Sequence, residues 1–247
     1  MKRSMAGISM AMALSFAGGA SAIPMELITN GGFETGDFTG WTATDLTGGS
    51  GSWFVDSVAT TPVSSSSTVG PASGGFYAVT DQGGPGTHAL EQAFTVPVGV
   101  SSLMLSFDMF MNDQSAVGPL DAGGLDHNLP LNQHARVDIL TALAGTFSVS
   151  VADIVDALVA PSVDPGPNPH AYKSYLFDLL PFVTGGTTYK LRFAEVDNQL
   201  FFNQGVDNVS LLADARQSVP EPTTLALLSI SFAGFAYSRR RARGCEI

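Results

Sequence analysis

The sequence of 247 residues has little cysteine and few basic side chains. Its only cysteine, Cys245, is the third residue from the C-terminus, so the chain has no internal disulfide and must be held by its core. Residues 23–218 contain five basic and twenty acidic residues, a net charge of −15. Because a surface this acidic repels phosphate backbones, we expect no nucleic acid partner.

The sequence also lacks several motifs of catalysis. It has no glycine-rich phosphate loop with a lysine, no Gly-x-Ser-x-Gly and no cysteine in its main part. Glycan hydrolysis by two carboxylates stays open, because Glu195 and Asp197 fall on one face of a predicted strand, about 7 Å apart. The prediction is nevertheless that the protein is not an enzyme.

The N-terminal residues have the pattern of a signal peptide. Lys2 and Arg3 precede an apolar stretch, and Ala20-Ser21-Ala22 fits the small-x-small cleavage pattern. We therefore expect a signal helix over residues 1–22 and an exported mature chain that begins at Ile23.

The C-terminal tail, residues 220–243, is the most informative stretch. Pro220, Glu221 and Pro222 form a rigid extended step, and residues 222–238 are 17 uncharged residues. This is long enough for one short transmembrane helix. A basic run follows, with Arg239, Arg240 and Arg241 at its start. The positive-inside rule places that run in the cytoplasm, so the chain is predicted to be anchored in the inner membrane.

The order Pro-Glu-Pro, apolar span, arginines resembles the PEP-CTERM sorting signal of Gram-negative bacteria. The resemblance implies that exosortase recognises the tail, cuts near the Pro-Glu-Pro step, and passes the protein to the cell surface or outside. It also implies an association with exopolysaccharide and the biofilm matrix. The alternative is an ordinary anchor that is never cut.

Between the two ends, residues 23–213 form one predicted domain, followed by a linker at 214–219. Short apolar runs separated by turn residues predict an all-β fold, a two-sheet antiparallel sandwich, with strong strand signals at 102–111, 135–142 and 187–196. A long polar loop is expected at 112–134. One short helix is predicted at 151–158, where apolar residues recur at helical spacing after a Ser150 cap.

The stretch Asn30-Gly31-Gly32-Phe33-Glu34, together with residues 206–211, is similar to carbohydrate-binding jelly rolls of the galactose-binding-like class. The resemblance implies that the first and last strands lie side by side. It also implies a structural Ca²⁺ ion held by Glu34 and Asp207. The alternative is that Glu34 caps a turn and Asp207 accepts hydrogen bonds from backbone amides.

A possible sugar site comes from Arg136, Asp138 and Arg192, which can share one sheet face. The alternative is that the two arginines simply pair with Asp138 and Glu195. The sequence thus predicts an exported, non-catalytic matrix or biofilm protein that contacts polysaccharide. Two other functions stay open: a glycan hydrolase that uses Glu195 and Asp197, and a structural adhesin that binds protein.

Overall fold

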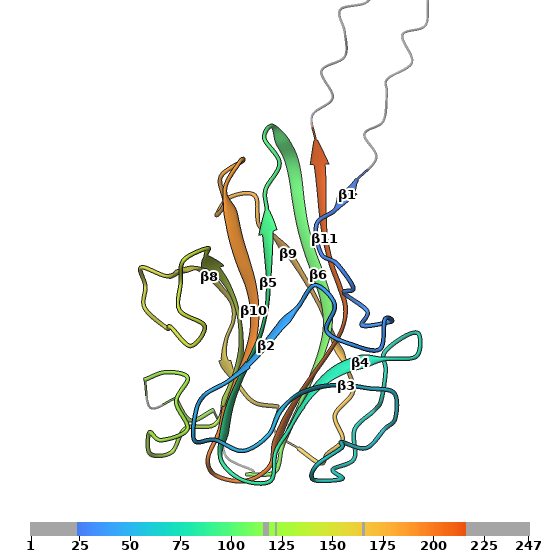
Figure 1. The fold of residues 1–247 in the computed structure, drawn as a ribbon, viewed down its shortest axis with the longest axis vertical. Helices are drawn as coiled ribbons and strands as arrows, with labels where there is room; N and C mark the ends of the chain where they lie inside the picture. Colours follow the sequence, from blue (N-terminus) through green and yellow to red (C-terminus); the bar gives the residue numbers. More distant parts are fainter. Residues whose placement is uncertain (1–23, 116–118, 122, 165, 216–247) are drawn as a thin grey trace, which may run out of the picture. The chain divides into compact units, whose positions relative to one another are not determined.

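The computed structural model describes residues 24–115, 119–121, 123–164 and 166–215, and these form two antiparallel β-sheets packed face to face (Figure 1). The predicted all-β sandwich is confirmed. No helix within these ranges is long and apolar enough to cross a membrane. The predicted signal helix at 1–22 and membrane helix at 222–238 lie outside the described residues.

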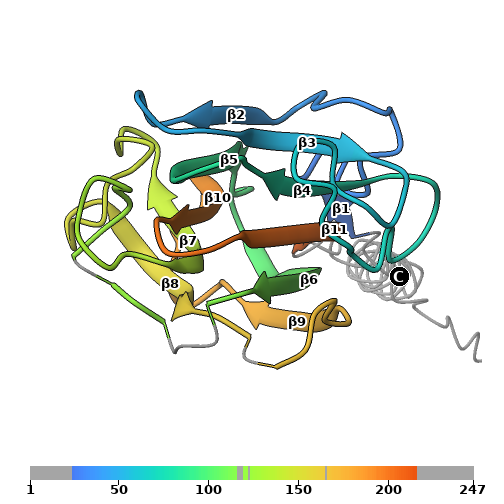
Figure 2. The same ribbon diagram turned by 90° about the horizontal axis from the view of Figure 1, so that it is seen from below.

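Each sheet has a central path of five strands (Figure 2). The first runs β3 (Ser52–Asp56), β4 (Tyr77–Asp81), β11 (Phe202–Ala215), β6 (Val100–Asp113), β9 (Lys173–Asp178), and β1 (Met25–Glu26) also pairs with β11. The second runs β2 (Thr42–Asp45), β5 (Gly86–Thr95), β10 (Thr188–Asp197), β7 (His134–Thr141), β8 (Ile154–Ser162). The three strongest strand predictions correspond to β6, β7 and β10.

The core lies between the sheets and follows from alternation along the strands. On β10, Leu191 and Phe193 point into the core, while Arg192 belongs to the opposite face. On β6, Leu105 and Phe107 also point into the core. The rings of Phe107 and Phe193 meet edge to face at 5.1 Å, so they join one sheet to the other.

The first and last strands lie side by side, as the resemblance implied: Met25 pairs with Ala213. The glycine turn that follows β1 packs directly on β11. A Cβ atom on Gly31 would lie 1.8 Å from the carbonyl oxygen of Val209, whose amide donates to the Gly31 carbonyl at 2.9 Å. Only glycine fits this close backbone approach, which explains its presence in the turn.

The predicted helix at 151–158 is wrong, because β8 begins at Ile154 and pairs with β7. Only a single turn precedes it, closed by the Ile154 amide donating to the Ser150 carbonyl at 3.0 Å. Register shifts interrupt the β7–β8 pairing, so the apolar residues that pack on the core are Val155, Leu158 and Val159. The extra residues of these bulges give a strand the spacing of a helix.

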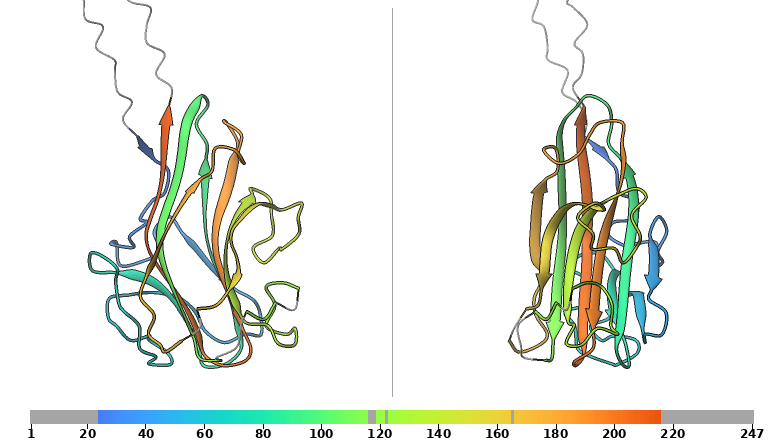
Figure 3. Two further views of the ribbon diagram at one scale, coloured as in Figure 1. Left: turned by 180° about the vertical axis from the view of Figure 1, so that it is seen from behind. Right: turned by 90° about the vertical axis from the view of Figure 1, so that its left-hand side faces the viewer.

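The sandwich has two different ends (Figures 1 and 3). β1 and the last residues of β11 lie at one end. The β4–β5 turn (residues 82–85) and the β10–β11 turn (residues 198–201) lie at the other, which we call the distal end. The 14 residues of β11 run between them, a span of about 45 Å at strand geometry.

Candidate functional site

A pocket of about 140 Å³ opens at the distal end. Two turns form it, and both connect one sheet to the other. Its lining residues are Gly83, Gly84, Pro85, Asp197, Asn198, Gln199, Leu200 and Phe201. Leu200 is 55% exposed and Phe201 is 38% exposed, so the pocket offers apolar surface to solvent beside a carboxylate and two amides.

The β10–β11 turn is held in place by the loop that precedes β7. The Asn198 amide group donates to the carbonyl of His127 at 3.0 Å. The Gln133 side-chain oxygen accepts from the backbone amides of Gln199 and Leu200 at 3.0 and 3.1 Å. The loop expected at 112–134 therefore fixes the position of the β10–β11 turn. The pocket is preorganised, because one of its two turns is held by these contacts.

Asp197 forms the polar wall of the pocket and is 3% exposed. Its carboxylate accepts a hydrogen bond from the Gly86 amide at 2.9 Å. Burial raises the pKa of Asp197 to about 6, and hydrogen bonds from Gln82 and Gly86 oppose this increase.

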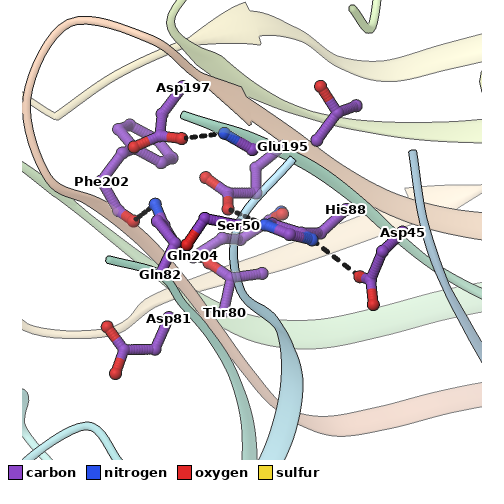
Figure 4. A network of polar contacts seen from close by, with 12 residues as sticks. Asp45, Ser50, Thr80, Asp81, Gln82, His88, Glu195, Asp197, Phe202 and Gln204 are labelled. Atoms are coloured by element: carbon purple, nitrogen blue, oxygen red, sulfur yellow. Dashed lines mark hydrogen bonds and ion pairs between the residues drawn. The ribbon is translucent and has the colours of Figure 1, made fainter. Parts of the chain in front are cut away.

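Behind the pocket, between the sheets, lies a buried polar cluster (Figure 4). Glu195 is fully buried and comes two residues before Asp197, on the same inward face of β10. Burial raises the pKa of Glu195 well above its usual value, and the charge of Asp197 adds to this effect, while the Thr80 hydroxyl opposes it. Neither carboxylate oxygen of Glu195 has a hydrogen bond of normal geometry.

His88 lies opposite Glu195 on β5 and is 1% exposed. Its Nδ1 is 2.7 Å from a carboxylate oxygen of Asp45, whose side chain is 42% exposed. Because the Asp45 carboxylate can only accept, Nδ1 donates the hydrogen bond. Nε2 is 3.9 Å from Glu195 Oε1. The three side chains therefore form a row from the surface to the interior (Figure 4).

The structure brings the predicted hydrolase pair together on one strand face, since Glu195 and Asp197 are alternate residues of β10. Only Asp197 lines the pocket. No motif in the sequence singles out His88, Gln82 or Gln204, all of which are buried. A signal for His88 was available: it alternates with Leu90, a core residue, and so occupies an inward position.

Arg136, Asp138 and Arg192 also come together, but as a buried ion cluster on the outer face of the second sheet. Asp138 accepts from Arg136 Nη2 at 2.7 Å and from Arg192 Nη2 at 2.6 Å. Arg192 Nη1 donates to the carbonyls of Thr146 and Ser148, so the loop after β7 covers this face. Burial lowers the pKa of Arg192, and Asp138 opposes the shift. Asp138 is thus one of the two partners expected in the alternative interpretation. The other expected partner, Glu195, lies on the inward face of β10 beside His88.

The predicted calcium ligands lie on β11, the middle strand of the first sheet (Asp207), and in the loop between β1 and β2 (Glu34). Glu34 accepts hydrogen bonds from the amides of Gly75 and Phe76 at 3.0 and 3.1 Å. Asp207 accepts from the amides of Ala72 and Ser73 at 2.9 and 3.1 Å. Burial raises the pKa of Asp207. Amide donors thus surround both carboxylates, as in the alternative reading, and Ca²⁺ binding stays a prediction.

The C-terminal tail matches a known family of sorting signals. Residues 218–241 match the PEP-CTERM protein-sorting motif. The tail carries an exosortase sorting signal. The chain is accordingly an exported protein that is sorted to the cell surface. The three residues Pro220, Glu221 and Pro222 fall inside the match, although they lie outside the described residues. No curated protein matches the sequence.

Solved structures with a similar arrangement of strands include three from different settings. TmCBM61, solved with β-1,4-galactotriose, has a TM-score of 0.47 and 11% identity over 77% of this chain and 99% of its own. A Stig cyclase from Fischerella has a TM-score of 0.44 and 19% identity over 78% of this chain and 100% of its own. The K3 adhesin domain of Lys-gingipain from Porphyromonas gingivalis has a TM-score of 0.44 and 14% identity over 78% of this chain and 98% of its own.

Proposed function

We propose that this protein is an exported surface domain that contacts polysaccharide without cleaving it. The signal peptide directs export, and the tail then anchors the chain in the inner membrane with the arginines in the cytoplasm. Exosortase cuts near the Pro-Glu-Pro step, and the domain passes to the extracellular matrix. The match of residues 218–241 to a sorting motif supports the export and sorting steps of this proposal.

The geometry of the domain supports display of the distal end. β11 ends at Ala215, and the sorting motif begins at residue 218. The pocket lies beyond the first residue of the same strand, about 45 Å from Ala215 at strand geometry. A domain attached through its C-terminal strand therefore keeps the pocket far from the point of attachment.

The pocket has the chemistry of a small sugar site. Phe201 offers a partly exposed aromatic ring, and Asp197, Asn198 and Gln199 offer hydrogen-bonding groups beside it. Sugars are bound by this combination, because a ring packs on the apolar face of the sugar while planar polar groups read its hydroxyls. The small volume suits one sugar residue at a chain end.

Hydrolysis is not part of the proposal. Two carboxylates must both reach the glycosidic bond in the usual mechanism. Glu195 is fully buried, and only Asp197 of the pair lines the pocket. Contact without turnover is the function that this arrangement supports best.

Sorting is tested in the native host with Glu221→Ala and with Pro220→Ala. We expect each variant to accumulate as the uncut membrane-bound precursor. Glu246→Ala, beyond the arginine run, is the control and should be processed normally. Normal release of both tail variants would show that the tail does not act as an exosortase signal in this protein.

Glycan contact is tested with the purified full chain in detergent on an array of bacterial polysaccharides and their end groups. We expect binding that Phe201→Ala reduces at least tenfold. The control is Phe182→Ala, because Phe182 is also half exposed but lies in the β9–β10 loop, away from the distal end. Absence of binding to every glycan would reject polysaccharide contact and favour the protein-binding adhesin.

A further inference from the structure

The end of the sandwich opposite the pocket carries exposed apolar side chains on two turns. We call it the proximal end; it consists of the β5–β6 turn (residues 96–99), the β9–β10 loop (residues 179–187) and the last residues of β11 (Figures 1 and 3). Val98 is 82% exposed and Phe182 is 50% exposed. The core does not cover these two side chains, so both are available to another surface.

The two turns pack on each other and form one surface. The Gly186 amide donates to the Val96 carbonyl at 2.8 Å, and a Cβ atom on Gly186 would lie 3.4 Å from Val98 Cγ2. Within the loop, the Phe182 amide donates to the Leu179 carbonyl at 3.0 Å. Val98 and Phe182 therefore belong to one preformed apolar tip, and neighbouring exposed apolar residues of this kind mark interaction sites.

The tip is built from uncharged sequence. Residues 92–107 and residues 179–189 contain no Asp, Glu, Lys or Arg, although residues 23–218 as a whole have a net charge of −15. Acidic surface is repelled by anionic lipid headgroups, and a charge that enters a bilayer loses its water. An apolar tip without charges is thus suited to the interface of a lipid bilayer.

The proximal end is also where the chain leaves the domain. β11 ends at Ala215, which pairs with Val100 at the start of β6. The sorting motif begins at residue 218, and the predicted membrane segment begins at residue 222. The six residues 216–221 span at most about 22 Å when fully extended. So short a connection makes the bilayer the nearest large surface to this tip.

We propose that the turns at 96–99 and 179–187 rest on the lipid surface of the inner membrane, with Val98 and Phe182 inserted among the headgroups. This inference rests on the anchoring step of the proposed function. Two inserted side chains bind weakly by themselves, but the tail keeps the effective concentration of lipid high, so a weak contact is sufficient. The contact limits rotation of the domain about its tail and keeps the distal pocket directed away from the membrane.

The test uses the full chain inserted through its tail into phosphatidylcholine vesicles, prepared with and without brominated phosphatidylcholine. Bromine on the lipid chains quenches a tryptophan only when its ring enters the bilayer. The native Trp41 and Trp53 lie in the core, so they should not be quenched. We expect bromine to quench Val98→Trp and Phe182→Trp. Leu131→Trp, at a 60% exposed position next to the residue that contacts the β10–β11 turn, is the control and should be unchanged.

A charge placed on the tip should remove the contact. Adding Val98→Asp to the Phe182→Trp chain should abolish the quenching, because a carboxylate is costly to move from water into lipid. Adding Leu131→Asp instead is the matched control, and the quenching of Phe182→Trp should persist. All three positions are exposed, so these variants should fold, and circular dichroism checks that they do.

The outcomes separate this inference from the anchoring step. A chain that does not float with the vesicles in a density gradient would refute anchoring, and this inference with it. A chain that floats while Val98→Trp and Phe182→Trp stay unquenched would overturn this inference alone. If Val98→Asp then slowed processing in the native host, the tip would contact the protease and not the lipid.

Discussion

Replacing Asp138 by alanine tests whether the arginines of the second sheet serve stability. Asp138 is fully buried and accepts four hydrogen bonds, from Arg136 at 2.8 and 2.7 Å and from Arg192 at 3.1 and 2.6 Å. Asp138→Ala leaves Arg192 fully buried without its counter-ion. Removing one partner of a buried ion pair costs about 3–5 kcal/mol, so we expect a loss of that size.

The loss can be measured by urea unfolding, followed by tryptophan fluorescence. Both tryptophans, Trp41 and Trp53, lie in the core of the domain and report its unfolding. For a domain of this size, 1 kcal/mol shifts the melting temperature by about 2–4 °C, so Asp138→Ala should lower it by roughly 6–20 °C. The control is Asp156→Ala on β8, a partly exposed position where we expect a loss below about 1 kcal/mol.

A loss below about 1 kcal/mol for Asp138→Ala would refute the reasoning, because it would mean that the arginines are not held by this carboxylate. A second variant separates pairing from packing. Changing Arg136 to Met, Asp138 to Leu and Arg192 to Met together removes all the charges, and should be far less harmful than Asp138→Ala alone. If the single variant instead abolished glycan binding with unchanged stability, these residues would form the sugar site after all.

Three further predictions concern other parts of the domain. Burial raises the pKa of Tyr77 from 10.0 to about 12, so between these two pH values the unfolded chain loses the Tyr77 proton while the folded chain keeps it. The free energy of unfolding should therefore fall by about 1.4 kcal/mol per pH unit between pH 10 and 12. Tyr77→Phe should flatten that fall in unfolding experiments at alkaline pH. Gly205→Ala should cost about 1–3 kcal/mol in urea unfolding, because the new Cβ would lie 2.1 Å from the ring of Phe110. If Glu34 and Asp207 hold Ca²⁺, EGTA should lower the melting temperature; an unchanged value would mean that backbone amides alone satisfy both carboxylates.

The strands could be predicted from the sequence because alternation is a local property. Residues 135–142 alternate between apolar and charged side chains, and β7 (His134–Thr141) has that pattern with Val137 and Ile139 in the core. β8 could not be recognised, since its bulges depend on pairing with β7 and change the spacing of its apolar residues. Here tertiary pairing determines the structure, and local propensity does not.

The candidate site could be predicted only in part. The period of a strand places Glu195 and Asp197 on one face, whatever the neighbouring strands are. His88 lies opposite Glu195 because of the register between β5 and β10. No pattern within either strand determines that register. Likewise, the sequence could not decide between a sugar site and an ion cluster for Arg192, because the decision rests on the loop whose carbonyls cover it.

The inward positions of β10 show where folding and function make different demands on the chain. Leu191 and Phe193 continue the apolar core, but the next two inward positions hold Glu195 and Asp197. A leucine at such a position would gain about 1.5–3 kcal/mol from burial, whereas removing a carboxylate from water costs stability. Acids at these two positions therefore oppose folding. Proteins tolerate such local conflicts mainly at sites that bind or react, and the change from apolar to acidic occurs on β10 where the strand approaches the pocket.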